Sequence, residues 1–529
     1  MRLLGTSALA LALGLSTAAL AAEKPADAAK PADAAKAAPA ELFQPDEVAS
    51  EGSVTVRGAR IDYKAIAGTL VIHPKGWDDA AKPKGDDEAS AEAAMFYTAY
   101  FKKGAAAADR PLIFVFNGGP GSSTVWLHMG AFGPRRVMTA DGQHTSPAPY
   151  TVIDNGESPL DVADLVFIDA PGAGFSRIAG KDKEKAFYGI DQDVYAFADF
   201  IKQFLSKYQR WNSPRYLFGE SYGTPRAAAL AAKLQSADSV DFNGIMLLSV
   251  TLAFDFWADA PQWNPGNDLP YVVTLPTYAA TAWYHNRVPG GRPAALEPFL
   301  AEAERFATGD YAAALIEGND ISAERKQAIA EKLSRYTGLT AAYILRSNLR
   351  INLGQFNRNL MDETGQTVGR LDTRFAGPSL DVLSREADYD PQSTAISSAY
   401  VSAFNDYARG KLGYGGGKAF KLFANVGDWD LKHTPPDASG PVEGAANVLP
   451  DLAFAIKTNP SLRVLVLGGY YDTATPYFEG RFQMRHLPVP ESLRGNISYK
   501  YYPSGHMVYA HEPSMKALHD DVAAFVKGR

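Results

Sequence analysis

The chain has 529 residues, of which 46% are hydrophobic and 21% are charged, and its formal net charge is -7. This composition is typical of a globular protein with a large core, and the acidic balance gives no electrostatic reason to expect a nucleic acid or an anionic membrane as partner. The absence of cysteine excludes disulfides, a thiol nucleophile and a lipid-modified cysteine.

The N-terminal segment predicts export. Residues 1–21 contain Arg2, an apolar run of leucine and alanine, and the small-x-small sequence ALA, a pattern typical of a cleaved signal peptide. A membrane anchor is the competing interpretation, but glycine, serine and threonine interrupt the run. Residues 22–45 contain KPADAA twice in tandem and predict a disordered tether. We therefore expect a periplasmic or secreted protein, and the lack of another long apolar run predicts no stable membrane span.

Residues 46–252 alternate strand and helix patterns, which predicts a mostly parallel α/β sheet. Residues 53–74 alternate apolar and polar side chains around Arg57-Gly58 and predict an antiparallel hairpin at the sheet edge. Further strands are expected at 94–101, 112–116, within 163–176 and at 242–250. One amphipathic helix is expected at 190–208.

The alternation lapses between 253 and 455, where helical patterns lie among aromatic, loop-rich sequence. We expect a large, mainly helical insertion that covers the top of the sheet as a lid; an independent second domain is the alternative. The sheet pattern resumes in residues 456–529, which are expected to complete the core. This last part has strand patterns in 461–472 and 497–509 and an amphipathic helix at 516–527.

A nucleophile is predicted within residues 215–234, where an apolar strand meets GESYG and an alanine-rich helix follows. Strand, sharp turn and helix form the context of the G-x-S-x-G nucleophile elbow, which lifts Ser221 above the sheet. The backbone N–H of Tyr222 would then point at a developing oxyanion. The motif also arises by chance in Gly-rich chains, so the prediction depends on its partners.

A serine nucleophile needs a base, and the base needs an acid to orient it. In α/β-hydrolases these residues follow the serine in the order acid, then histidine, each in a loop after a strand. Asp472 follows the strand pattern at 463–467, and His506 lies between the last strand and the last helix. Ser221, His506 and Asp472 are therefore the predicted triad.

Other candidates are assigned structural roles. His511 lies at the start of the last helix, where capping is the usual role, and Asp169 precedes the serine in the chain. Asp428 and Asp430 fall inside the insertion. The histidines are scattered and match no metal-ligand spacing, so we expect neither a metal nor a cofactor.

The second oxyanion donor is expected in NGGPG at 117–121. Three glycines in five residues leave backbone N–H groups unobstructed, and Gly118-Gly119 can form an anion-binding nest. The alternative is a turn chosen only for tightness, but a tight turn does not need three glycines.

Taken together, these motifs resemble the serine carboxypeptidase family: NGGPGSS with FGP at 132–134, DAPGAGFS at 169–176, GESYG, Asp472 in its loop and GHMV at 505–508. The resemblance implies an α/β-hydrolase fold. It also implies roles for eight residues, namely a catalytic triad (Ser221, Asp472, His506), oxyanion donors (Gly119, Tyr222) and a site for the terminal carboxylate of the substrate (Asn117, Glu220, with Gly118).

The chain departs from the family pattern at two positions, one of which bears on carboxylate recognition. Glu220 can bind a carboxylate only when it is protonated, which implies an acidic optimum. The family commonly has a second glutamate two residues before the Gly-Pro, where this chain has Ala131, so the proton-sharing pair is missing. Ser122 also stands where the family usually has cysteine.

The leading hypothesis is an exported serine carboxypeptidase acting on peptide substrates. The alternatives are an esterase, an acyltransferase or another serine peptidase that uses the same triad, and, less favoured, a non-catalytic envelope protein that uses the fold for binding. The sequence leaves the oligomeric state and the residue preference at the cleaved bond open.

Overall fold

The structure, a computed structural model, describes residues 42–77, 90–256 and 259–528. The expected signal peptide at 1–21 lies outside the described residues, and so does the tether at 22–45 apart from its last four residues. No helix in the described part of the chain is both long and apolar enough to cross a membrane.

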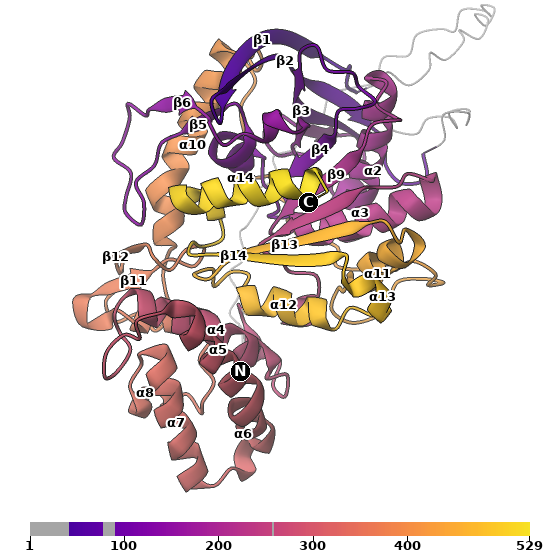
Figure 1. Ribbon diagram of the computed structural model, residues 1–529. Coiled ribbons are helices and arrows are strands. Elements are labelled where there is room, and N and C mark those ends of the chain that lie inside the picture. The colour runs from indigo at the N-terminus through magenta and orange to yellow at the C-terminus, as the bar shows by residue number, and fades with distance from the viewer. Residues whose placement is uncertain (1–41, 78–89, 257–258, 529) are drawn as a thin grey trace, which may run out of the picture. The chain divides into compact units, whose positions relative to one another are not determined.

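Within the described residues, a central sheet of ten strands organises the chain (Figure 1), with the order β1-β2-β3-β7-β4-β9-β10-β13-β14 and β8 beside β3. The pairs β1–β2, β2–β3 and β3–β7 are antiparallel, whereas the pairs from β7 through β14 are parallel. This arrangement confirms the predicted mostly parallel sheet with an N-terminal hairpin. The ten strands are β1 (Glu47–Val56), β2 (Ala59–Ile72), β3 (Glu92–Lys102), β4 (Leu112–Phe116), β7 (Asp164–Ile168), β8 (Arg177–Ala179), β9 (Arg215–Glu220), β10 (Gly244–Leu248), β13 (Arg463–Gly469) and β14 (Ile497–Tyr502).

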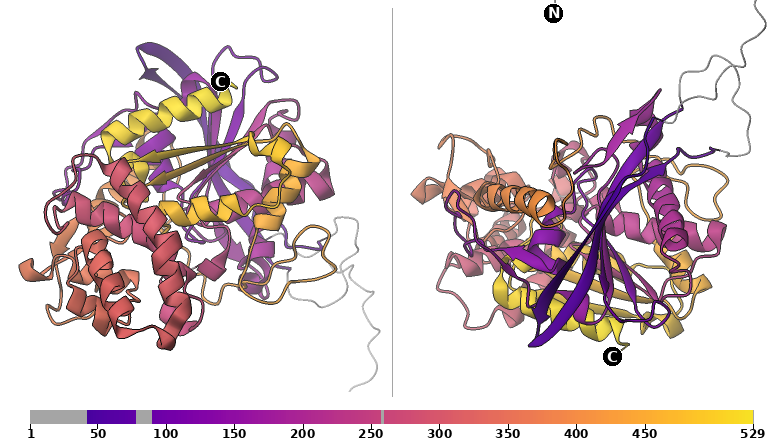
Figure 2. Two further views of the ribbon diagram at one scale, coloured as in Figure 1. Left: turned by 60° about the horizontal axis from the view of Figure 1, so that its bottom comes forward. Right: turned by 90° about the horizontal axis from the view of Figure 1, so that it is seen from above.

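Both faces of the central strands are buried, which explains their continuous apolar runs. In β4, Leu112, Phe114 and Phe116 pack into one core, and Ile113 and Val115 pack into the other. Helices α2, α3 and α11 contribute to the first core, and α10 and α14 contribute to the second. The right-hand view of Figure 2 shows α10 (orange) and α2 (magenta) on opposite sides of the strands.

The segment between β10 and β13 is mainly helical. Its helices α4 to α9 share a third apolar core with residues that follow β13, and α4 packs on α12. Helix α11 packs on α3 and so belongs to the layer of core helices. The helices are α1 (Lys183–Phe187), α2 (Ile190–Lys207), α3 (Gly223–Asp238), α4 (Leu269–Tyr284), α5 (Leu296–Phe306), α6 (Ala312–Glu317), α7 (Ala323–Thr337), α8 (Ala341–Arg346), α9 (Leu353–Asn359), α10 (Pro391–Gly410), α11 (Leu449–Thr458), α12 (Tyr477–Arg485), α13 (Glu491–Arg494) and α14 (Glu512–Val526).

In the part of the chain that the structure describes, two short ladders lie outside the central sheet. They join β5 (Arg135–Val137) to β6 (Val152–Asp154) and β11 (Gln366–Val368) to β12 (Ala376–Pro378). Within the central sheet, the parallel register places the carboxyl ends of neighbouring strands level with one another. Glu220 at the end of β9 is opposite Leu248 of β10, and Gly469 at the end of β13 is opposite Tyr502 of β14. The loops that carry the predicted triad therefore leave the sheet on the same side, at the carboxyl ends of the parallel strands.

Candidate active site

The predicted nucleophile lies on a sharp turn between β9 and α3. Ser221 has a φ of 60°, in the left-handed region, and its backbone N–H donates to Leu248 O at 2.9 Å. Strand and helix pass so closely that a Cβ on Gly219 would lie 2.0 Å from Gly223 O. Only glycine fits at this crossing, so the spacing of the G-x-S-x-G motif follows from the geometry of the turn.

The predicted base and acid are hydrogen-bonded. His506 Nδ1 lies 2.8 Å from Asp472 Oδ2, and both side chains are buried. Asp472 Oδ1 accepts the backbone N–H groups of Ala474 at 2.9 Å and Thr475 at 3.0 Å, and its Oδ2 accepts the Thr475 hydroxyl at 2.7 Å. These donors stabilise the carboxylate and fix its orientation towards the imidazole.

The electrostatics of His506 suit a general base. Burial lowers its pKa, but the charge and hydrogen bond of Asp472 oppose that effect, and the net result is a pKa above the ordinary value. The hydrogen bonds of the described residues include none between the Ser221 hydroxyl and His506. The contact that would activate the serine is therefore still a prediction, and such contacts often tighten only when substrate binds.

The insertion contributes a segment that holds the two triad loops together. The His506 backbone N–H donates to Leu371 O at 2.6 Å, and the Thr473 N–H and hydroxyl donate to Arg370 O at 3.2 and 2.7 Å. The sequence of 370–374, RLDTR, carries no recognisable motif, and its bonds join residues about a hundred positions apart. Sequence reasoning missed this role because only the folded chain brings the segment to the loops.

The predicted oxyanion donors lie on adjacent stretches of backbone. A Cβ on Gly118 would lie 2.3 Å from the Tyr222 nitrogen, so the Gly-rich loop touches the turn that carries the serine. Gly119 has a φ of +106°, and a Cβ there would lie 2.6 Å from the Ser122 nitrogen. Among the described residues, no hydrogen bond occupies the N–H of Gly119 or Tyr222. Both donors are thus available for an anion.

The predicted carboxylate-binding residues also meet. Asn117 Nδ2 donates to Glu220 Oε1 at 2.8 Å, while the buried Glu220 Oε2 has no hydrogen-bond partner. The Tyr509 hydroxyl faces this carboxyl without a well-formed hydrogen bond. Burial raises the pKa of Glu220 to about 7, against the opposing charge of His506. A protonated Glu220 would present an O–H donor whose neighbour, the Tyr509 hydroxyl, makes no well-formed hydrogen bond with it.

Ala131 lies buried in the π-helical turn Leu127–Phe132. Its neighbour Gly130 packs against aromatic side chains, since a Cβ there would lie 2.6 Å from the Tyr400 hydroxyl and 2.7 Å from the Tyr509 ring. The high pKa of Glu220 therefore arises from burial among tyrosines, without a second glutamate to share its proton.

The rejected candidates have structural contacts. His511 precedes α14, and its Nδ1 lies 2.7 Å from Ser514 Oγ in the first turn of that helix. Asp169 Oδ1 accepts the backbone N–H and the hydroxyl of Thr124 at 2.7 and 2.8 Å, which ties its turn to the segment after the Gly-rich loop. The Asp430 carbonyl accepts the N–H of Ile190 at 2.9 Å.

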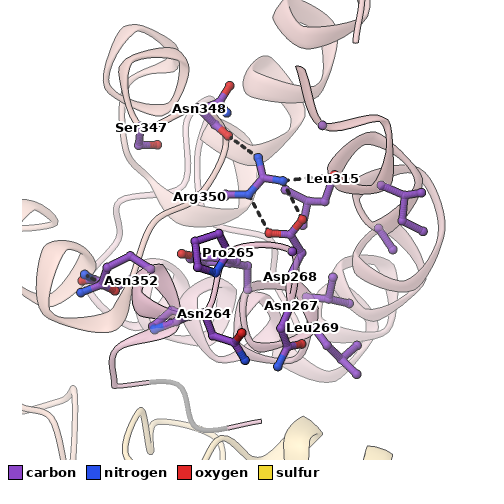
Figure 3. Close-up of a pocket in the computed structure, with 18 of the residues that line it drawn as sticks. Asn264, Pro265, Asn267, Asp268, Leu269, Leu315, Ser347, Asn348, Arg350 and Asn352 are labelled. Carbon is purple, nitrogen blue, oxygen red and sulfur yellow. Dashed lines mark hydrogen bonds and ion pairs between the residues drawn. The ribbon is translucent and has the colours of Figure 1, made fainter. Parts of the chain in front are cut away.

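A separate pocket of about 890 Å³ lies in the insertion (Figure 3). Arg350 forms two 2.6 Å contacts with the Asp268 carboxylate in its wall, and Asn264, Asn267 and Asn348 also line the pocket. None of the predicted site residues lines this pocket. Within the described ranges, no group of three or more His, Asp or Glu side chains could hold a metal ion.

A model of the serine carboxypeptidase family matches residues 86–253. The chain is 32% identical over 142 residues to the pheromone-processing carboxypeptidase KEX1 of Yarrowia lipolytica. The matched stretch covers 26% of this chain and 21% of that protein. It is 28% identical over 187 residues to the retinoid-inducible serine carboxypeptidase of Homo sapiens, which covers 34% of this chain and 35% of that protein. The matches thus span about a fifth to a third of these relatives.

The fold is similar to the crystal structure of KEX1, a prohormone-processing carboxypeptidase from Saccharomyces cerevisiae. The TM-score is 0.53 with 15% identity, and the superposition covers 88% of this chain and 91% of that one. The predicted α/β-hydrolase fold and the predicted resemblance to serine carboxypeptidases are therefore confirmed. The family match includes the Gly-rich loop and the elbow and ends before Asp472 and His506.

Proposed function

We propose that this chain, similar in motifs and fold to serine carboxypeptidases, is itself a serine carboxypeptidase that releases C-terminal residues from peptides. The observation that carries the proposal is the buried Asn117–Glu220 pair beside the nucleophile elbow. A neutral carboxyl with an unpartnered oxygen has no obvious structural use, because burying an unsatisfied polar group is destabilising. A substrate carboxylate would accept the proton that this group offers.

In the proposed acylation step, Ser221 Oγ attacks the last peptide carbonyl carbon while its proton moves to His506 Nε2. Asp472 holds the imidazole in the required tautomer through Nδ1 and stabilises the imidazolium. The N–H groups of Gly119 and Tyr222 donate to the oxyanion of the tetrahedral intermediate. His506 then gives the proton to the leaving amine as the C–N bond breaks.

Deacylation reverses these roles. A water molecule loses a proton to His506 Nε2 and attacks the acyl carbon, and the Ser221 oxygen leaves and recovers that proton. The shortened peptide departs with a new terminal carboxylate. Because Asn117 and Glu220 can hold that carboxylate in turn, the same site allows successive removal of residues.

The proposal is tested by digesting matched peptides that differ only in a free or an amidated C-terminus, at pH 6, with products read by mass. We expect single-residue shortening of the free acid and at least about tenfold slower cleavage of the amide, because a charge-assisted hydrogen bond contributes roughly 1.5–3 kcal/mol. The Ser221→Ala variant should cleave neither peptide. If the wild-type protein cleaved the free-acid and the amidated peptide at equal rates, recognition of the terminal carboxylate would be contradicted.

A second candidate is an ester hydrolase, acyltransferase or other serine peptidase with the same triad. Ala131 favours it, because Glu220 lacks the second carboxyl that would share its proton. Turnover of simple esters with no cleavage of any free-acid peptide would support this alternative. A non-catalytic binding role would require that a fluorophosphonate probe fails to label Ser221.

The proposed working site is the periplasm or the exterior, by way of cleavage after residue 21. The sequence pattern of residues 1–21 carries this part of the proposal. N-terminal analysis of the mature protein from the producing cell's periplasm or medium should give a chain that begins at residue 22. A cell-associated chain that retains residues 1–21 would contradict it.

A further inference from the structure

Arg226 and Asp193 form an ion pair in the interior of the core. Arg226 belongs to α3, the helix that follows the nucleophile, and Asp193 belongs to the first turn of α2. Two contacts of 2.6 and 3.0 Å join the guanidinium to the carboxylate, and the exposed fractions of the two side chains are 0% and 1%. None of the proposed catalytic steps uses this pair.

The remaining N–H groups of Arg226 hold the Gly-rich loop. Its Nη1 donates to the Asn117 carbonyl at 2.7 Å, and its Nη2 donates to the Pro120 carbonyl at 3.0 Å. These two carbonyls bracket Gly118 and Gly119, the residues expected to form the oxyanion nest. The guanidinium also lies 5.4 Å from the centroid of the Tyr222 ring, on the other predicted donor residue.

We infer that Arg226 is a positioning residue for the oxyanion hole, and that Asp193 fixes its orientation. A run of glycines has little conformational preference of its own, so the direction of its N–H groups must come from outside contacts. Arg226 makes such contacts on both sides of Gly118-Gly119 while its backbone belongs to α3, the helix that directly follows Tyr222. One side chain therefore sets the two predicted donors relative to each other.

A purely stabilising role explains these contacts less well. A buried ion pair is often replaceable by apolar residues of similar volume at little cost in stability. The planar guanidinium, however, offers donors in a fixed fork that can hold one carboxylate and two separate carbonyls at once. A lysine would keep the charge beside Asp193 but could not maintain this set of directions.

The inference rests on the proposed function, since an oxyanion hole matters only for acyl transfer. Its test uses the second-order rate of Ser221 labelling by a fluorophosphonate, whose phosphoryl oxygen enters the oxyanion hole and which needs no terminal carboxylate. We expect Arg226→Lys to label about 10- to 100-fold more slowly, because a misplacement of about 1 Å has an effect of this size. Peptide hydrolysis should lose kcat by a similar factor.

The matched control is Arg210→Lys. Arg210 is 3% exposed, pairs with Asp164 at 2.7 Å and donates to the Arg110 carbonyl at 2.7 Å. These contacts lie where β4 and β7 begin, whereas the elbow follows the carboxyl end of β9. The control variant should lower the melting temperature as Arg226→Lys does, while its labelling rate stays within about twofold of wild type. Slow labelling in both variants would assign the effect to general destabilisation and overturn the inference.

A double variant, Arg226→Met with Asp193→Leu, removes the hydrogen bonds to the Gly-rich loop and both buried charges together. Because no unpaired charge is left buried, we expect the variant to fold. It should label at least as slowly as Arg226→Lys. If either folded Arg226 variant labels at the wild-type rate, the positioning role is wrong. If the wild-type protein is labelled but leaves peptides intact, the proposed carboxypeptidase function is contradicted. The role of Arg226 is still tested in that case, because it is read from the labelling rates.

Discussion

Two buried histidines of this chain have different surroundings. His506, in the loop after β14, binds one carboxylate through Nδ1, and no hydrogen bond of the described residues occupies its Nε2. His433, in the loop before α11, binds two: Nδ1 lies 2.7 Å from Asp191, and Nε2 lies 2.9 Å from Asp451. The first ring keeps a nitrogen for proton transfer, and the second has none.

The second carboxylate turns an imidazole into a fixed cation. Although burial opposes the charge, the hydrogen bonds to Asp191 and Asp451 raise the pKa of His433 to about 9. The cation joins the starts of α2 and α11 to the loop that carries Trp429, whose indole N–H donates to the Tyr222 hydroxyl at 3.1 Å. A histidine beside an aspartate is therefore evidence for a base only when its other nitrogen is free.

The largest expected effect comes from exchanging the histidines for glutamine. His506→Gln should lower kcat by about 10⁶-fold, because loss of the base removes the whole nucleophilic route. His433→Gln should change kcat by less than about threefold, since its ring touches no reacting atom. Steady-state peptide hydrolysis measures both, and comparable losses would contradict the distinction.

The acids should differ in the same way. Asp472→Asn should lower kcat by about 10⁴-fold, since the amide favours the wrong imidazole tautomer. Asp191→Asn removes one of two carboxylates from His433 and should leave kcat within about threefold of wild type. Rates compared at equal fractions of folded protein provide the check.

The third effect concerns stability. His433→Gln should cost about 2 kcal/mol of unfolding free energy at pH 6, because two charge-assisted hydrogen bonds are lost. The folded-state pKa of His433 is raised, so its contribution is fully present below the ordinary value of 6.5 and is lost as the pH rises through about 9. Urea unfolding of both proteins at pH 6, 8 and 10 should give a shrinking difference, and a constant one would contradict the account.

The smallest expected effect belongs to Glu220→Gln. The glutamine keeps a neutral donor towards the substrate carboxylate but cannot ionise. In the wild type, KM for a free-acid peptide should rise up to about tenfold per pH unit above 7, as Glu220 becomes charged. The variant should show a flat KM from pH 6 to 8, measured on one peptide. A rising KM in the variant would assign the titration to another group.

Sequence reasoning reached the fold and the predicted triad loops because both have local signals. The apolar run at 112–116 and the turn at Ser221 can be recognised from neighbouring residues alone. The role of Arg226, the clamp of Leu371 on His506 and the pairing of His433 could not be predicted, because each joins residues far apart in the chain. The sequence also showed that Ala131 removes the proton-sharing partner of Glu220, whereas in the structure burial, together with the charge of Asp472, raises the pKa of that carboxyl.

The ratio of kcat/KM for matched free-acid and amidated peptides, followed from pH 5 to 9, tests the central claim most directly. We expect a ratio of at least about ten below pH 7 that falls towards one as Glu220 ionises, while the limb that reports His506 affects both peptides alike. A ratio near one at every pH would contradict recognition of a terminal carboxylate by Asn117 and Glu220.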